Sequence, residues 1–189
     1  MKATFMPNAK MSEEEGLIKF LKTAGRLKKE PRRGWVIRAG VSNPESVADH
    51  TFRLVLLSML LGDLRGLDTE KMMKLAVIHD LGESLTGDLT PMDVEKIETK
   101  EKDEDTAMEE VLSNLPTKLR ESYLKLWRDL CSRSSKEAKL VSEADKLEMA
   151  LQASEYMEEG YSKEMLSEFK ISAIQRMSDI QMLDLIRLL

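Results

Sequence analysis

Apolar residues recur at intervals of three and four along most of the chain, which is the spacing that places them on one face of an α-helix. Ser12 followed by Glu15 fits a capping box at the start of the first such segment, and Gly160 marks the end of a long one. Further helices are predicted over residues 44–64, 69–78, 119–130, 136–159, 162–169 and 172–189. The pattern therefore predicts an all-α fold, a compact bundle of many helices.

Three segments depart from the regular pattern. Residues 52–61 are apolar almost all round, which predicts a helix at the centre of the fold. Residues 35–41, bracketed by Gly34 and Gly40, form the one β-like stretch and lie in a short basic segment. Residues 93–110 are acidic and rich in lysine, which is typical of a solvated helix or a mobile connection.

The length of 189 residues is usual for one domain, and an apolar content of 42% is enough to build a core. We expect a single domain over residues 1–189, with its motif-bearing core at about residues 15–160. The C-terminal helices, residues 161–189, carry much apolar surface for a chain end. That surface either packs back on the bundle or forms an interface with a partner subunit.

Composition excludes several classes of protein. The single cysteine, Cys131, excludes an internal disulfide and a cysteine-rich zinc finger. The longest apolar run, residues 54–61, is far too short to cross a membrane, and the N-terminus shows no signal-peptide pattern. We therefore expect a cytoplasmic protein without a membrane partner. The net charge of −5 argues against nucleic acid as the main partner.

Candidate chemistry is concentrated in residues 77–88, where an apolar helix runs directly into ionisable side chains. These side chains are His79, Asp80, Glu83 and Asp88. Buried charge is costly unless it is paired or bound to a metal. His79 and Glu83 are four residues apart and so would share one helical face. The glycines of the segment would let the backbone turn back and aim Asp88 at the same point.

Two further polar residues interrupt apolar helices in the same way. His50 lies in the helix at residues 47–61, and Asp145 lies in the most apolar part of a later helix. Taken singly, such a histidine is more often a hydrogen-bonded core residue, and such an aspartate is more often a cap or a surface charge. Together with His79 and Asp80 they form a mixed nitrogen and oxygen set. Such a set suits Mn, Fe, Co, Ni or Zn and leaves open positions for catalysis.

The order of His50, His79-Asp80 and Asp145 resembles the metal signature of the HD-domain phosphohydrolase superfamily. The strings at residues 45–51, 79–91 and 143–149 are similar to those of its 5′-deoxynucleotidase branch. That branch includes the bacterial YfbR-type enzymes and the HD domain-containing protein 2 group of eukaryotes and archaea. The similarity covers about residues 15–160.

This resemblance implies a metal-dependent phosphomonoesterase that releases phosphate from deoxyribonucleoside 5′-monophosphates. By motif position, His50, His79, Asp80 and Asp145 would be the ligands of one divalent ion, which would be Co, Mn, Zn, Ni, Fe or Mg. A nucleotide would be the small-molecule substrate. The resemblance also favours a homodimer.

The resemblance assigns further residues to the reaction. Glu83 and Asp88 would be the catalytic carboxylates beside the attacking water and the scissile bond. Arg33 and Trp35 would match the Arg-Trp pair that contacts the substrate, although here a glycine separates them. Arg38 is the alternative phosphate contact. A buried tryptophan that anchors the turn is an equally good interpretation of Trp35.

Two other functions compete with this one. The first is a different HD-type reaction, either the triphosphohydrolysis of dNTPs or the cleavage of a cyclic phosphodiester. The second is a non-catalytic helical protein that binds nucleotides or protein partners through a vestigial site. The complete metal signature, together with Glu83 and Asp88, argues against the second.

Overall fold

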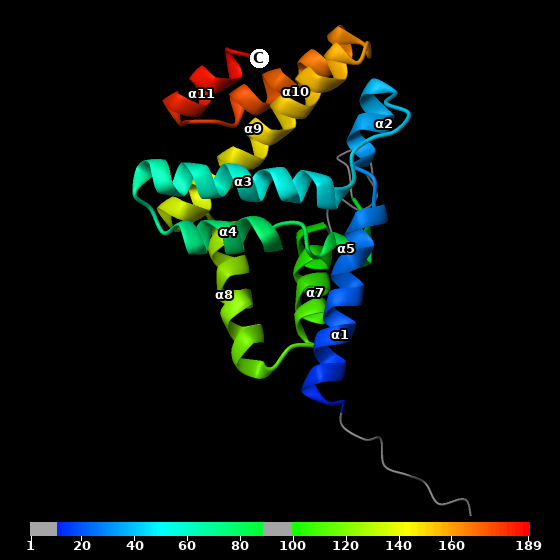
Figure 1. The fold of residues 1–189 in the computed structure, drawn as a ribbon, viewed down its shortest axis with the longest axis vertical. Coiled ribbons are helices and arrows are strands. Elements are labelled where there is room, and N and C mark those ends of the chain that lie inside the picture. Colours follow the sequence, from blue (N-terminus) through cyan, green and yellow to red (C-terminus); the bar gives the residue numbers. More distant parts are fainter. Residues whose placement is uncertain (1–10, 89–99) are drawn as a thin grey trace, which may run out of the picture.

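A computed structural model describes residues 11–88 and 100–189 of the chain (Figure 1). The described residues are mostly helical and contain no strand, only an isolated bridge between Pro31 and Ser46, so the all-α prediction is confirmed. The elements are α1 (Glu13–Ala24), the 3₁₀ helix η1 (Gly25–Lys29), α2 (Arg33–Ala39), α3 (Val47–Arg65), α4 (Thr69–Ile78), α5 (Glu83–Thr86), α7 (Lys100–Leu112), α8 (Thr117–Ser132), α9 (Lys136–Glu158), α10 (Lys163–Gln175) and α11 (Ile180–Ile186).

Local caps explain where the main helices begin. The capping box of Ser12 and Glu15 is present at α1. A second capping box, formed by Ser46 and Asp49, starts α3. The helix therefore begins at Val47, and the prediction that it begins near residue 44 was early by one turn. Each of these caps satisfies backbone N–H groups that have no partner inside the helix.

The central layer consists of α3 and α4, which run antiparallel side by side, with α9 packed against both (Figure 1). Their buried apolar side chains form one cluster, to which α10 and α11 add Ala173, Met182 and Ile186. The C-terminal helices therefore pack back on the bundle, which is one of the two alternatives that the sequence left open. This shared cluster supports one domain over the chain, which stays a prediction.

Two smaller clusters flank the centre. One joins η1, α7 and α8 to the ends of α3 and α4. The other seats α2 on α9 and α10, where the Trp35 ring stacks against Tyr156 and Phe169 with ring centroids 5.3 and 4.3 Å apart. This third cluster fixes the basic segment at one end of α3, beside the polar residues described below.

The β-like stretch at residues 35–41 was predicted wrongly, because it is the helix α2 followed by a left-handed glycine. Gly40 has φ of 65°, and its N–H donates to the carbonyls of Trp35 and Val36. A strand would place Trp35 and Ile37 on the same face, yet Trp35 is buried and Ile37 is exposed. Packing of the indole into the third cluster therefore decides the conformation.

Three other expectations need correction. α3 is central but not surrounded, because Phe52 and Leu64 are exposed on its outer side. α7 buries Met108, so it is not merely a solvated helix, and residues 93–99 of that acidic segment lie outside the described residues.

The C-terminal break falls after Gln175 rather than near residue 170, because Asp179 caps α11 and pairs with Arg65. No helix in the described part of the chain is long and apolar enough to span a membrane.

Candidate active site

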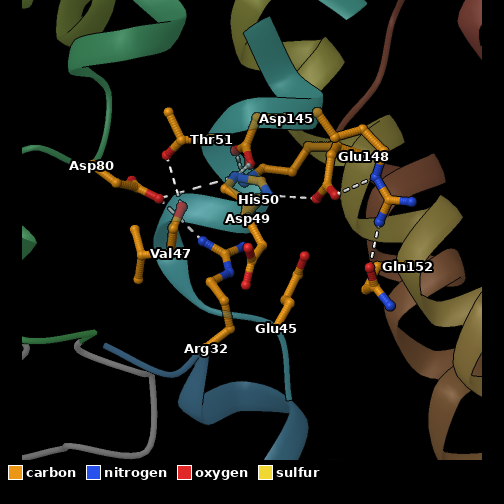
Figure 2. A network of polar contacts seen from close by, with 12 residues as sticks. Arg32, Glu45, Val47, Asp49, His50, Thr51, Asp80, Asp145, Glu148 and Gln152 are labelled. Atoms are coloured by element: carbon orange, nitrogen blue, oxygen red, sulfur yellow. Dashed lines mark hydrogen bonds and ion pairs between the residues drawn. The ribbon is translucent and has the colours of Figure 1, made fainter. Parts of the chain in front are cut away.

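Three helices bring the predicted ligand atoms together at one end of α3. Ligand atoms of His50, His79 and Asp145 all lie within 4.8 Å of one another. Nε2 of His50 is 3.1 Å from Nε2 of His79 and 3.2 Å from Oδ1 of Asp145. Oδ2 of Asp80 lies 2.9 Å from Nε2 of His79 and 4.0 Å from Nε2 of His50. The four side chains thus converge as the sequence predicted, and Figure 2 shows Asp80 and Asp145 around His50.

Each side chain is aimed by its place on a helix. His50 follows the capped first turn of α3 and is fully buried. His79 is the C-terminal cap residue of α4, and its Nδ1–H donates to the Ala76 carbonyl at 2.7 Å. That bond fixes the orientation of the ring, so that Nε2 of His79 is directed toward His50 and Asp80. Asp145 lies in the middle of α9, where this helix packs against α3.

The donor set fits a divalent metal ion. Two ligands at about 2.1 Å from an ion, in neighbouring octahedral positions, lie about 3.0 Å apart. Three separations agree with this value: 2.9 Å between Asp80 and His79, 3.1 Å between the two histidines, and 3.2 Å between His50 and Asp145. The 4.0 Å between Asp80 and His50 is close to the ~4.2 Å expected for opposite positions on such an ion. Two imidazoles and two carboxylates leave further positions open on a six-coordinate ion, which is typical of a catalytic site.

A second group of donors, Glu45, His50 and Glu148, also lies within 4.8 Å. Its carboxylate oxygens are already engaged within the protein. Oε1 of Glu148 accepts from Arg53 Nε at 2.8 Å, and Oε2 of Glu148 contacts Nδ1 of His50. Oε1 of Glu45 accepts from Trp35 Nε1 at 3.0 Å. The first group therefore remains the candidate metal centre.

The electrostatics of the site favour charged carboxylates. Burial raises the pKa of Asp80, but the His79 charge and the hydrogen bond from His79 hold it well below its usual range. Burial likewise raises the pKa of Asp145, but the Lys146 ammonium and other nearby groups keep it far below its ordinary value. Both groups are thus present as anions, the form that binds a cation.

Arg32, which was not among the site residues expected from the sequence, lies close to these charged carboxylates. Arg32 Nη1 is 3.1 Å from Oδ2 of Asp80. Burial lowers the pKa of Arg32, but the charges of four carboxylates raise it above its ordinary value; they belong to Asp80, Asp145, Glu83 and Asp88. Arg32 is adjacent to the predicted Arg33, which was the available signal. Only the start of α2 at residue 33 decides which of the two faces the cluster.

The backbone between His79 and Glu83 differs from the predicted helix. α4 ends at Ile78 and α5 begins at Glu83, with the Glu83 N–H donating to the Asp80 carbonyl between them. His79 and Glu83 therefore do not share one continuous helical face, because the chain turns between them. The charges of Glu83 and Asp88 nevertheless both act on Arg32, so the two carboxylates border the same site.

Asp88 is held by contacts to the segment before α2. Its Oδ2 accepts from the Arg33 backbone N–H at 2.6 Å, and its own N–H donates to Oε1 of Glu30 at 3.1 Å. Gly87 has φ of 75°, and a Cβ there would lie 3.1 Å from Oε1 of Glu30. The positive φ thus favours glycine at this turn, and a Cβ would also press on the Glu30 carboxylate that binds the Asp88 N–H.

The predicted substrate-binding residues lie apart from one another. Arg33 Nη1 donates to the Asp88 carbonyl at 3.3 Å. Trp35 is only 2% exposed, and its Nε1–H donates to Oε1 of Glu45 at 3.0 Å. Arg38 lies over the Phe169 ring, 5.8 Å from its centroid. These positions favour the anchoring role of Trp35, and the contacts of all three with substrate stay predictions.

Comparison with known proteins identifies the class. The family model of the HD domain matches residues 24–182, so the chain belongs to the HD domain family and the resemblance seen in its motifs is confirmed. It is 38% identical over 171 residues to the 5′-deoxynucleotidase HDDC2 of Mus musculus, covering 90% of this chain and 85% of the mouse protein. The human protein of that name is 37% identical over 170 residues, with coverage of 90% and 82%. A conserved hypothetical protein of Pyrococcus furiosus has the same fold, with a TM-score of 0.76, 37% identity and coverage of 91% and 99%.

Proposed function

We propose that this chain is a divalent-metal-dependent 5′-deoxynucleotidase, which hydrolyses deoxyribonucleoside 5′-monophosphates to the deoxynucleoside and phosphate. The observation that carries the proposal is the cluster of His50, His79, Asp80 and Asp145 with Arg32 beside it. Such a site combines a metal-ligand set with a fixed positive charge for an anionic substrate. The two HDDC2 relatives, which are named 5′-deoxynucleotidases, support the same substrate class.

One divalent ion would be held by His50, His79, Asp80 and Asp145. When bound, it would supply Lewis acidity, which lowers the pKa of water toward neutrality and offsets charge on a phosphate group. The buried imidazole of His50 and the anionic carboxylates define that position before any ion arrives. The chemical identity of the donors favours Mn, Fe, Co, Ni or Zn over Ca.

Arg32 is the residue best placed to hold the phosphate. Its Nη1 already donates to Asp80, and the charges of Asp80, Asp145, Glu83 and Asp88 keep its pKa raised, so it stays a cation. The planar fork of arginine suits two phosphate oxygens at once. Arg33 lies one residue further on and would add charge at the rim, beside Asp88.

Glu83 and Asp88 would divide the proton transfers. Oδ2 of Asp88 already accepts from the Arg33 backbone N–H, so we assign to Glu83 the proton of the attacking water. Asp88 would then orient the departing 5′-oxygen from its fixed place at the start of α2. Phosphoryl transfer needs alignment and charge neutralisation more than covalent participation, which this arrangement supplies.

Product analysis tests this function. The protein is incubated with dAMP, AMP, dATP and a cyclic dinucleotide, each with added Mn²⁺, and the products are separated by chromatography. We expect deoxyadenosine and inorganic phosphate from dAMP, with slower turnover of AMP, and loss of turnover in Glu83→Gln. Release of triphosphate from dATP, or of a mononucleotide from the cyclic substrate, without phosphate release from dAMP would replace the proposal with another HD-type reaction.

We also propose that the chain forms a homodimer through the outer side of α3. Phe52, Leu56, Leu60 and Leu64 are spaced by four residues and are all exposed, so they form an apolar stripe along the helix. Light scattering at micromolar concentration should give twice the mass of one chain. Leu60→Glu should yield monomers, whereas Leu188→Glu, a change at another exposed leucine, should not. A monomeric parent protein would reject the dimer.

A cytoplasmic location is proposed as well. A chain with a single cysteine has no internal disulfide to maintain, which suits a reducing compartment. Cell fractionation, with a cytoplasmic and a membrane marker as controls, tests this location. Recovery in the membrane or secreted fraction would contradict it.

A further inference from the structure

Glu148 is a fully buried carboxylate beside the candidate metal centre, and none of the roles above uses it. It lies on α9, three residues after Asp145, and so on the same side of that helix. Its Oε2 is hydrogen-bonded to Nδ1 of His50. Figure 2 shows Glu148 on the far side of the His50 ring from Asp80. A carboxylate buried to this extent needs strong partners, because its desolvation is unfavourable.

The contact with Glu148 determines which nitrogen of His50 can bind a metal. An ionised carboxylate only accepts hydrogen bonds, so Nδ1 of His50 must carry the proton in that contact. Nε2 is then directed to the opposite side, 3.2 Å from Oδ1 of Asp145. His79 obtains the same arrangement from a backbone carbonyl, that of Ala76. The two histidines are thus oriented by different means, one by a side chain and one by the main chain.

Arg53 in turn fixes Glu148. Its Nε donates to Oε1 of Glu148 at 2.8 Å, and its Nη1 donates to Oε1 of Glu155 at 2.6 Å. Its Nη2 contacts Gln152. Arg53 lies three residues after His50 on α3 and spans the contact between α3 and α9. Both oxygens of Glu148 are therefore occupied, one by each of two residues on α3.

We propose that Glu148 is a positioning residue of the metal centre: it keeps Nδ1 of His50 protonated and directs Nε2 toward the metal, and Arg53 locks it in place. The inference rests on the proposed function insofar as His50 is taken as a metal ligand. Carboxylates that orient a ligating histidine in this way raise both metal affinity and activity.

Glu148→Gln tests the proposal with almost no change of shape. Arg53 Nε requires an acceptor, so the amide oxygen of Gln would face Arg53 and its NH₂ group would face His50. Nδ1 of His50 would then accept a hydrogen bond, and Nε2 would carry the proton that excludes a metal. Zn²⁺ titration by calorimetry should show binding weakened about 10–100-fold. Glu155→Gln is the matched control, because Glu155 also accepts from Arg53 but does not touch His50; its Zn²⁺ affinity should stay within about twofold of the parent.

Nuclear magnetic resonance gives a second readout that a merely structural role would not produce. The chain has only two histidines, so protein labelled with ¹⁵N-histidine gives two imidazole patterns, each of which reports its protonated nitrogen. With one equivalent of Zn²⁺, His50 of the parent should be protonated at Nδ1. In Glu148→Gln the proton of His50 should move to Nε2, while His79 should keep its Nδ1 proton.

The outcomes separate this proposal from the proposed function. Unchanged Zn²⁺ affinity and an unchanged His50 pattern in Glu148→Gln would overturn it, as would absence of Zn²⁺ binding by the parent protein. If the parent binds Zn²⁺ but releases no phosphate from any nucleotide, the function fails and the positioning role is still decided by the titration. If circular dichroism shows that Glu148→Gln is unfolded, Arg53→Met replaces it. That variant should weaken Zn²⁺ binding several-fold, and an affinity equal to the parent's would contradict the proposal.

Discussion

The two ends of the proposed site, a metal end around His50 and a phosphate end around Arg32, are held by different kinds of structure. His50 and Asp145 belong to α3 and α9, and His79 caps the C-terminus of α4; these three helices share the central apolar cluster. Arg32 and Asp88, in contrast, lie on segments outside any helix interior, between short elements. The metal end is therefore positioned by the core itself, since the helices are rigid and packed on one another.

The phosphate end depends instead on a few polar contacts between short segments. The Arg33 N–H is bound by Asp88, the Asp88 N–H by Glu30, and Arg32 by Asp80. Each contact joins the segment before α2 to the chain after His79. We therefore expect substitutions at the metal end to abolish metal binding, and substitutions at the phosphate end to alter substrate handling in graded steps.

The largest effect is expected at the metal end. Asp145→Asn removes an anionic ligand and should abolish stoichiometric metal binding. Because the lost charge stabilisation is worth several kcal/mol, activity should fall by at least ~10³-fold. Metal content by mass spectrometry and phosphate release check this expectation. Asp184→Asn, at an exposed aspartate paired only with Arg187, is the control and should behave like the parent. If Asp145→Asn keeps both its metal and its activity, Asp145 is not a metal ligand and the proposed metal end is wrong.

A smaller effect is expected for the two carboxylates at the phosphate end. Glu83→Gln should lower kcat by about 10²–10³-fold with metal content unchanged, since general acid–base catalysis contributes that much. Asp88→Asn should lower kcat less, because the amide oxygen can still accept from the Arg33 N–H. Steady-state kinetics at saturating metal separate the two. If kcat falls more in Asp88→Asn than in Glu83→Gln, the roles assigned to the two carboxylates must be exchanged.

The arginines sharpen the comparison further. Arg32→Met should lower kcat/KM by about 10–100-fold, which corresponds to the loss of one charge-assisted hydrogen bond to phosphate. Arg33→Met should lower it by less than about fivefold, because the backbone N–H that binds Asp88 remains. Kinetics with dAMP measure both values. The reverse order would show that Arg33, one of the two arginines that the sequence left as candidates, is the main phosphate contact.

The smallest effect on activity is expected at Trp35. Trp35→Phe removes the hydrogen bond to Glu45 and part of a buried ring. The free energy of unfolding in urea should fall by about 2 kcal/mol, while KM for dAMP should stay within about twofold of the parent. If instead KM rises more than tenfold at unchanged stability, the indole contacts the substrate.

The sequence predicts the metal end and the phosphate end of the proposed site to different extents. His50, His79, Asp80 and Asp145 could be found because each interrupts an apolar helical pattern, and periodicity fixes the face on which a helical residue lies. Glu148 could have been found in the same way, since it lies three residues after Asp145 on a helix whose bounds were predicted within one residue. Its role depends on a contact with His50, 98 positions away, which no local pattern encodes.

The conformation around Arg32 and Asp88 is harder to predict from the sequence, for a physical reason. Arg32, Arg33 and Arg38 are alike in sequence, and only the start of α2 and the burial of Trp35 decide where each one points. That burial is a tertiary contact with α9 and α10, which also explains why a helix was taken for a β-like stretch. In the same way, the turn after α4 separates His79 from Glu83 through hydrogen bonds that the spacing of four does not reveal.

The central claim is that the cluster of His50, His79, Asp80 and Asp145 makes this chain a metal-dependent deoxynucleotidase. Phosphate release from a panel of dNMPs and NMPs tests it most directly, using protein stripped of metal and then supplied with Mn²⁺, Co²⁺, Zn²⁺ or Mg²⁺ in turn. We predict no phosphate release by the stripped protein and recovery of phosphate release with at least one of these ions. We also predict faster phosphate release from dNMPs than from NMPs. Equal release with and without metal, or no release from folded protein with any of the four ions, would contradict it.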